Sequence, residues 1–228
     1  MPYQELIYCY HYEKTLLDPL EVRIEDIDRF TIEWEGHTDF SGDQPRLWVA
    51  AHWGASIPGV AFIAARRQKR ISGIATAALK RETVPAGFRH HVLRRYRNLE
   101  KYFYGGHAYF HEESPREIVR AFRRKEDMIV IFDMPAINES AIYLPFFGAQ
   151  RGFRAGALRH AQRNDYLIQP YWVDYLGRDR MRVWCGEPVR ASERESVEKA
   201  LQVLLHKIER QPCKWFIFEQ LPFYPVRS

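Results

Sequence analysis

The chain alternates between short apolar runs and longer segments in which apolar residues recur at helical spacing. Six runs rich in Val, Ile, Ala and aromatic residues predict β-strands: Leu47–Ala51, Gly73–Ala78, Ala108–His111, Met128–Asp133, Tyr166–Val173 and Met181–Cys185. Five segments between and after them predict helices: Pro58–Arg70, Ala86–Tyr104, Pro115–Glu126, Arg154–Arg163 and Ser192–Arg210. Strands that alternate with helices predict an α/β sandwich, in which helices flank a largely parallel or mixed central sheet.

Serine and proline residues stand where several of these helices are expected to begin. A serine side chain can cap the free N–H groups of a first turn, and proline is favoured at the first helical position. In the last predicted helix a glutamate follows the serine at the capping-box spacing. The three marked starts are Ser56 with Pro58, Ser114 with Pro115, and Ser192 with Glu195. We therefore predict that these positions are helix boundaries.

Length and composition fit one globular domain over residues 1–228. A single core stops growing only at about 250–300 residues, and no repeat or linker divides this chain. The longest mostly apolar run, Trp48–Ala65, contains His52, Ser56 and Pro58, so no transmembrane helix is expected. The N-terminus has no pattern of a secretory signal, which favours a cytoplasmic protein.

Cysteine usage argues against a fold held together by disulfides or by a structural metal ion. Cys9, Cys185 and Cys213 are odd in number, far apart and outside any paired spacing. A disulfide framework or a zinc site would require such pairs. We expect all three to be reduced, packed thiols, and we expect no metal and no cofactor.

The net charge is +5, and basic residues cluster at Arg66–Arg70, Arg94–Arg97 and Arg120–Lys125. Such clusters could meet phosphate, an acidic carrier protein or an anionic membrane leaflet. A solvated helix face is the favoured interpretation, because Arg116, Arg120 and Arg124 fall at four-residue spacing beside Glu117. No nucleic-acid-binding motif accompanies the charge, so nucleic acid is not expected as a partner.

The most informative segment is an apolar strand, Leu47–Ala51, that ends at a histidine. His52 is followed by the turn residue Gly54 and then by a predicted helix. Ligands in open α/β sheets bind just beyond the carboxyl ends of strands, and a nearby helix N-terminus favours neutral imidazole. His52 is therefore a candidate general base. The alternative is a hydrogen-bonded core histidine.

Several segments resemble the lipid A late acyltransferases, a branch of the lysophospholipid acyltransferase superfamily. Ala51-His-Trp-Gly is similar to their Ala/Gly-His-Phe-Gly-Asn-Trp-Glu block. Five more blocks follow in the family's order: Ile129-Val-Ile-Phe-Asp133, Tyr143-Leu-Pro-Phe-Phe-Gly148, Gly156-Ala-Leu-Arg-His-Ala161, Tyr166–Val173 and Trp215-Phe-Ile-Phe-Glu-Gln. The resemblance covers the chain from about Ile27 to Phe223.

This resemblance implies transfer of an acyl group from acyl carrier protein or acyl-coenzyme A to a hydroxyl or amine of a lipid or small-metabolite acceptor. It implies neither a metal nor a covalent enzyme intermediate. His52 would be the base, and an acyl chain would lie in an apolar groove. Arg151 and Arg154 precede a predicted helix, where an anion such as the donor's phosphate could bind; the alternative, which the sequence favours, is that they are ordinary solvent-exposed arginines. The expected substrate-binding residues are Trp53, Gly54, Phe146, Phe147, Gly148, Arg151 and Arg154. For Phe146, Phe147 and Gly148 a plain packing role is the alternative.

Two departures from the family stand out. Family members carry Asp or Glu five residues after the histidine, but that position is Ile57 here. Asp133, at the end of another predicted strand, is the best substitute partner for His52, because strand ends converge on one edge of a sheet; a surface or capping aspartate is the alternative. The family's N-terminal membrane helix is also absent, which predicts action from the cytoplasm or peripherally on the inner face of the membrane.

Two other functions compete with acyl transfer. The loss of an acid at Ile57 would suit a decayed enzyme that binds lipid or carrier protein without turnover. Gly54-Ala-Ser-Ile-Pro58 loosely resembles a nucleophile elbow, which would make Ser56 the nucleophile of a hydrolase. Proline replaces the second glycine of that motif, which disfavours the hydrolase.

Overall fold

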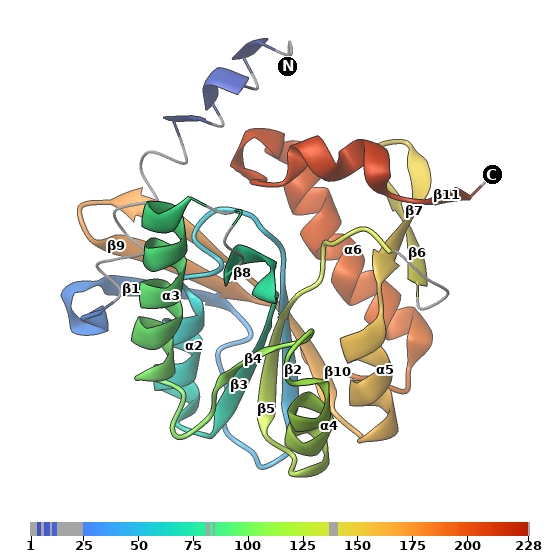
Figure 1. Cartoon of the computed structure of the whole chain (residues 1–228). Helices are drawn as coiled ribbons and strands as arrows, with labels where there is room; N and C mark the ends of the chain where they lie inside the picture. The colour runs from blue at the N-terminus through green and yellow to red at the C-terminus, as the bar shows by residue number, and fades with distance from the viewer. Residues whose placement is uncertain are drawn as a thin grey trace.

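The computed structural model describes residues 4–5, 7–9, 11–12, 25–80, 83, 85–136 and 141–227. Within these ranges, eight strands form a central sheet in the order β1-β9-β8-β2-β5-β3-β4, with β10 beside β8 (Figure 1). Their bounds are β1 Thr31–Gly36, β2 Arg46–Ala50, β3 Ile71–Ala75, β4 Ala108–Phe110, β5 Asp127–Ile131, β8 Leu167–Gly177, β9 Arg180–Cys185 and β10 Val189–Arg190. Strands β8, β2, β5, β3 and β4 run parallel, whereas β8 and β9 are antiparallel.

Helices cover both faces of this sheet (Figure 1). Helices α2 (Val60–Arg67) and α3 (Ala86–Glu100) lie on one face. Helices α4 (Pro115–Arg123), α5 (Gly156–Arg163) and α6 (Arg194–Arg210) lie on the other. The predicted α/β sandwich with a largely parallel, mixed sheet is thereby confirmed.

The central strand β2 illustrates why the sequence forms this sheet. All of its side chains are buried, as in parallel strands that are covered on both faces. Leu47 and Val49 pack on the side of α4, α5 and α6, and Trp48 and Ala50 pack on the side of α2. The alternation of a strand thus divides one apolar run between two cores.

A second sheet, in the order β11-β7-β6, was not predicted. It consists of β6 (Ala141–Phe146), β7 (Ala149–Arg154) and β11 (Val226–Arg227). Phe147 and Gly148 form the β6–β7 turn with φ of 46° and 73°, and such two-residue turns connect tight hairpins. The remaining elements are the short 3-10 helices η1 Ile27–Arg29, η2 Ala77–Lys80, η3 Pro212–Lys214 and η4 Phe218–Phe223.

The predicted strands and helices are present, with corrections at their ends. The strand expected at Gly73–Ala78 ends at Ala75 and gives way to η2. Helix starts differ more: the N-cap residues of α2 and α6 are Gly59 and Glu193, not the predicted serines. Ser114 does precede α4 but makes no side-chain capping bond. Local spacing located the helices, but backbone geometry decided their first residues.

The prediction for the cysteines was wrong for two of three. Cys9 and Cys213 form a disulfide across 204 residues of sequence, which tertiary proximity allows and sequence spacing cannot reveal. Cys185 is a free, buried thiol, as predicted. Separately, no helix in the described ranges has the length and apolar character needed to cross a membrane.

Candidate active site

Two neighbouring strands bring His52 and Asp133 to the same edge of the central sheet. Strands β2 and β5 are parallel, and their register pairs Ala50 with Ile131. The ladder extends one step further, where the N–H of Phe132 donates to the carbonyl of Ala50 at 2.9 Å. Each strand ends there, so the residues that follow meet beyond the carboxyl edge, where ligands of α/β proteins bind.

His52 and Asp133 contact each other twice. The Nδ1 atom of His52 lies 2.9 Å from Oδ1 of Asp133, and the backbone N–H of His52 donates to Oδ2 at 2.9 Å. Because an ionised carboxylate only accepts hydrogen bonds, this pairing places the ring proton on Nδ1 and leaves Nε2 as an acceptor. The Asp133 side chain is 0% exposed and that of His52 is 24% exposed, so the imidazole remains open to a ligand.

Trp215 and Tyr224 also donate hydrogen bonds to Asp133. The indole Nε1–H of Trp215 donates to Oδ2 of Asp133 at 2.7 Å, and the Tyr224 hydroxyl donates to the Asp133 carbonyl oxygen. Burial, and then the nearby Asp133 charge, raise the pKa of Tyr224 above its usual value, which keeps this donor protonated. Buried indole and phenol groups usually find such partners. No local sequence pattern marks either residue as part of a site.

The turn after β2 is clamped by the chain that follows α6. The N–H of Phe216 donates to the His52 carbonyl at 2.7 Å, and the N–H of Gly54 donates to the Lys214 carbonyl at 2.9 Å. Gly54 has φ +53°, and a Cβ there would lie 2.7 Å from the Val173 carbonyl oxygen. Glycine is thus required at this position by both conformation and space.

Trp53, an expected substrate-binding residue, is 2% exposed and donates from Nε1 to the Gln211 carbonyl at 3.3 Å. Phe146 is fully buried, with its ring 5.2 Å from that of Trp215. Because both side chains are buried, their contacts in this structure are with the protein: Trp53 with Gln211 and Phe146 with Trp215. Phe147 is partly exposed and stacks on Trp215 at 6.1 Å, and Gly148 is exposed beside it. Contact of these residues with substrate stays a prediction.

Arg151 and Arg154 occupy β7 and hold protein carbonyls. Arg151 donates to the carbonyls of Phe146 and Leu221, each at 3.1 Å. Arg154 donates to the carbonyl of Pro135 at 3.1 Å. These bonds fix the β6–β7 hairpin against neighbouring loops. Anion binding by the two arginines remains a prediction, and the structure gives their guanidinium groups a structural role.

Ser56 is placed unfavourably for a nucleophile. It is 0% exposed, and its hydroxyl donates to the Trp53 carbonyl at 2.7 Å and accepts from the Val173 N–H at 3.4 Å. A nucleophile elbow instead exposes its serine above the sheet. This packing argues against the hydrolase alternative.

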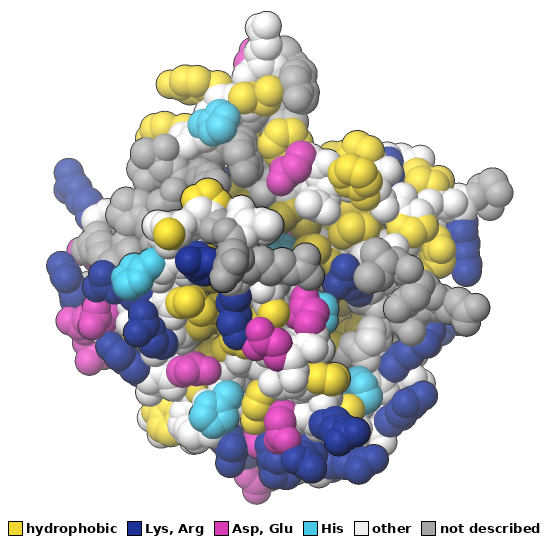
Figure 2. Space-filling model, viewed as in Figure 1, with side chains coloured by type: hydrophobic (Ala, Val, Ile, Leu, Met, Phe, Trp, Pro, Cys, Tyr) yellow, Lys and Arg dark blue, Asp and Glu magenta, His cyan; other side chains and the backbone are white. Residues whose placement is uncertain are grey.

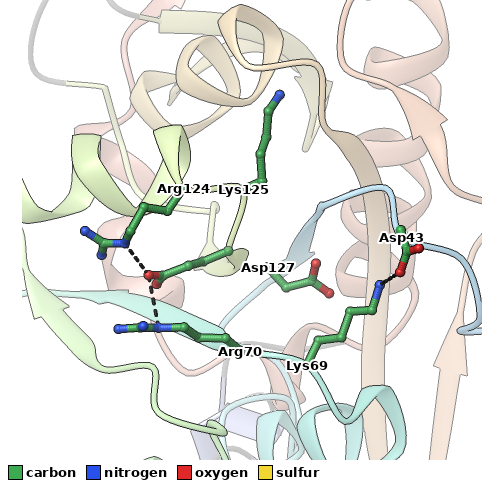
Figure 3. Close-up of a pocket in the computed structure, with 7 residues that line it drawn as sticks. Asp43, Lys69, Arg70, Arg124, Lys125 and Asp127 are labelled. Atoms are coloured by element: carbon green, nitrogen blue, oxygen red, sulfur yellow. Dashed lines mark hydrogen bonds and ion pairs between the residues drawn. The ribbon is translucent and has the colours of Figure 1, made fainter.

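The opposite edge of the sheet carries a group of charged residues. A hollow of about 360 Å³ there is lined by Asp43, Lys69, Arg70, Arg124, Lys125, Glu126 and Asp127 (Figure 3). Glu126 pairs with Arg70 at 3.0 Å and with Arg124 at 2.7 Å, and Lys69 pairs with Asp43 at 2.6 Å. The charges of this hollow therefore largely satisfy one another. Figure 2 shows further Lys and Arg side chains gathered over α4 and α5, in keeping with a solvated helix face.

No protein-family model and no curated protein matches this chain. Among solved structures, the chain is similar to the crystal structure of the 1-acyl-sn-glycerophosphate (LPA) acyltransferase, PlsC, from Thermotoga maritima. That match has 14% sequence identity and a TM-score of 0.47, and it covers 91% of this chain and 96% of that chain. A function for this chain therefore has to be argued from its own site and sequence.

Proposed function

We propose that this protein is an acyltransferase of the lysophospholipid acyltransferase superfamily, similar to the lipid A late acyltransferase branch. It moves an acyl group from a thioester of acyl carrier protein or coenzyme A to a hydroxyl or amine of a lipid or small-metabolite acceptor. The observation that carries the proposal is the contact between His52 and the buried carboxylate of Asp133, 2.9 Å apart at the carboxyl edge of the sheet.

The proposed chemistry needs a base that becomes transiently charged. Nε2 of His52 takes a proton from the acceptor hydroxyl or amine while the oxygen or nitrogen of that group attacks the thioester carbonyl carbon. Asp133 stabilises the imidazolium that forms, as a buried carboxylate does in a catalytic triad. When the tetrahedral intermediate collapses, its carbon–sulfur bond breaks and the thiolate takes the proton from Nε2. The products are the acylated acceptor and the free thiol, and His52 is again neutral.

The contact also favours an active enzyme over a decayed one. The decayed alternative depended on Ile57, which stands where the family carries its acid. In this chain the proposed acid partner comes from the loop after β5 instead, because Asp133 meets Nδ1 of His52 directly. Trp215, which satisfies the other carboxylate oxygen at 2.7 Å, belongs to the last of the six blocks that resemble the family. The altered dyad is thus supported by a neighbour from a family-like segment.

For the working location, we propose the cytoplasm, with peripheral contact to the inner face of the cell membrane. Hydrophobic side chains lie exposed at the end of the chain that follows Trp215: Phe223 is 71% exposed and Val226 is 58% exposed. Figure 2 shows hydrophobic side chains at this end of the molecule. Exposed apolar side chains such as Phe223 and Val226 can enter the headgroup region of a bilayer.

The test is whether purified protein releases thiol from an acyl-coenzyme A or acyl carrier protein thioester only when an acceptor is supplied. His52→Ala should lower this rate by about 10²–10⁴-fold without loss of folded protein. The matched control is His206→Ala, which removes an exposed histidine of α6 and should leave the rate unchanged. Full activity of folded His52→Ala, or an acyl group trapped on Ser56, would overturn the proposal.

A further inference from the structure

Two lysines share one carboxylate beside the turn that carries His52. Lys207 lies in the last turn of α6, and Lys214 ends η3. Their Nζ atoms are 3.4 Å and 3.6 Å from the two carboxylate oxygens of Asp174 on β8. The side chains of both lysines are 23% exposed, and that of Asp174 is 14% exposed. These three groups lie together in a half-buried place.

Tryptophan rings form the floor of this lysine pair. Nζ of Lys207 lies 4.6 Å from the ring centroid of Trp53 and 5.0 Å from that of Trp172. Nζ of Lys214 lies 5.5 Å from the ring of Trp53. Aromatic faces attract a cation without neutralising it, and they keep water from one side of it. The hydrogen bond from Lys207 to Asp174, at 3.4 Å, is long for a charge-assisted bond. Lys207 can therefore accept a closer anion.

The lysine pair is tied to the catalytic turn by the backbone. Trp53 directly follows His52, and the carbonyl of Lys214 accepts the N–H of Gly54 at 2.9 Å. The backbone of Lys214 therefore adjoins the turn that carries His52. Arg151 and Arg154, the anion-binding residues expected from sequence, already hold protein carbonyls. For binding an anion, the pair Lys207 and Lys214 is therefore better placed than the pair Arg151 and Arg154.

We propose that Lys207 and Lys214 form an anion subsite that binds a phosphate group of a substrate. This proposal rests on the acyl-transfer function proposed above and names the chemistry of one of its ligands. The phosphate displaces part of the interaction of Lys207 with Asp174, and Asp174 keeps both ammonium groups aimed at the same point. A phosphate could belong to the donor, in coenzyme A or phosphopantetheine, or to the acceptor. The chemistry of recognition is the same in both cases.

Equilibrium binding, measured by calorimetry on the whole protein without turnover, tests the subsite. The probes form two pairs: coenzyme A with pantetheine for the donor, and glycerol 3-phosphate with glycerol for the acceptor. In the pair that uses the subsite, the phosphate-bearing probe should bind wild type roughly tenfold or more tightly than its partner, since charge-assisted bonds contribute on that scale. Lys207→Gln and Lys214→Gln should remove that difference, whereas Lys207→Arg should retain most of it.

The matched control is Lys199→Gln, which neutralises an exposed lysine of the same helix. The subsite is refuted if both glutamine variants fold and bind every phosphate-bearing probe as wild type does. It is also refuted if inorganic phosphate binds but neither pair shows a difference that depends on Lys207. His52→Ala separates the two proposals: it should keep the phosphate preference. If its turnover is also normal, the catalytic proposal fails while the subsite stands.

Discussion

Trp215 donates to the same carboxylate oxygen of Asp133 that accepts the backbone N–H of His52, at 2.7 Å and 2.9 Å. With Oδ2 occupied twice, Oδ1 is directed at the imidazole. The geometry of the His52–Asp133 pair is thus fixed in part by Trp215, which follows η3. Because Asp133 has no exposed surface, these donors replace the water that would otherwise solvate its charge.

Asp133→Asn should lower kcat on the order of 10²-fold or more, because a neutral amide cannot stabilise the imidazolium of the transition state. The KM for both substrates should change little, since the carboxylate is buried. Steady-state kinetics over a range of pH would also show an altered pH–rate profile. Asp165→Asn is the control, because it neutralises an exposed aspartate. A kcat for folded Asp133→Asn within about twofold of wild type would exclude Asp133 as the partner of His52.

Trp215→Phe should lower kcat and weaken the fold together. The phenyl ring keeps most of the packing but lacks the N–H that Asp133 accepts, and a buried acceptor that loses its partner costs about 1–3 kcal/mol. A merely structural role would lower the free energy of unfolding and leave the pH–rate profile of the remaining activity unchanged. We expect that profile to change, because the carboxylate that orients His52 is less well held. Denaturant unfolding and kinetics on the same preparation distinguish the two cases.

Gly54→Ala should destabilise the protein by about 1–3 kcal/mol, because a left-handed backbone conformation is strained for a non-glycine residue. The added Cβ would also lie 2.7 Å from the Val173 carbonyl oxygen. Gly87→Ala serves as the control, since Gly87 lies in α3 with open space around its Cα and alanine is the better helix former. Thermal unfolding of both variants tests the contrast. Equal melting temperatures would show that the turn after His52 adapts freely.

Ser56→Ala should preserve the acyl-transfer rate while lowering stability by about 1 kcal/mol, the net value of a typical hydrogen bond. Among the described residues, the hydroxyl bonds backbone groups of Trp53 and Val173. The experiment is an activity assay paired with urea unfolding. A large loss of rate in well-folded protein would revive the serine hydrolase.

Cys185 should not react with thiol reagents in the native protein near neutral pH. Burial raises the pKa of its thiol from 9.0 to about 12, so the reactive thiolate is scarce. Because the folded pKa is the higher one, this group's contribution to stability is complete below pH 9.0 and is lost as the pH rises towards about 12. With a thiol reagent we expect no reactive thiol in the native protein, one per chain in denaturant, and three per chain in denaturant after reduction. Three thiols in denaturant without reductant would contradict the Cys9–Cys213 disulfide.

Sequence alone determined the elements that have a local cause. The apolar run of β2 predicted a strand that ends just before His52, and the structure buries all of that strand's side chains. Helical spacing located α2 to α6 because an amphipathic period is written into neighbouring residues. The same reasoning about strand ends singled out Asp133 as the partner of His52, and the two side chains do meet. Their catalytic roles stay predictions.

Only the tertiary structure decided which distant groups meet. Trp215 and Tyr224 reach Asp133 from 82 and 91 residues away, and no periodicity signals such a contact. The Cys9–Cys213 pair spans 204 residues and was missed for the same reason. The sequence does not indicate whether Ser56 is exposed, and the packing around the turn after β2 buries it completely. Local pattern fixes the type of each element, because it depends on neighbours along the chain. Register and packing between elements fix the site, because they depend on contacts between residues that are far apart in the sequence.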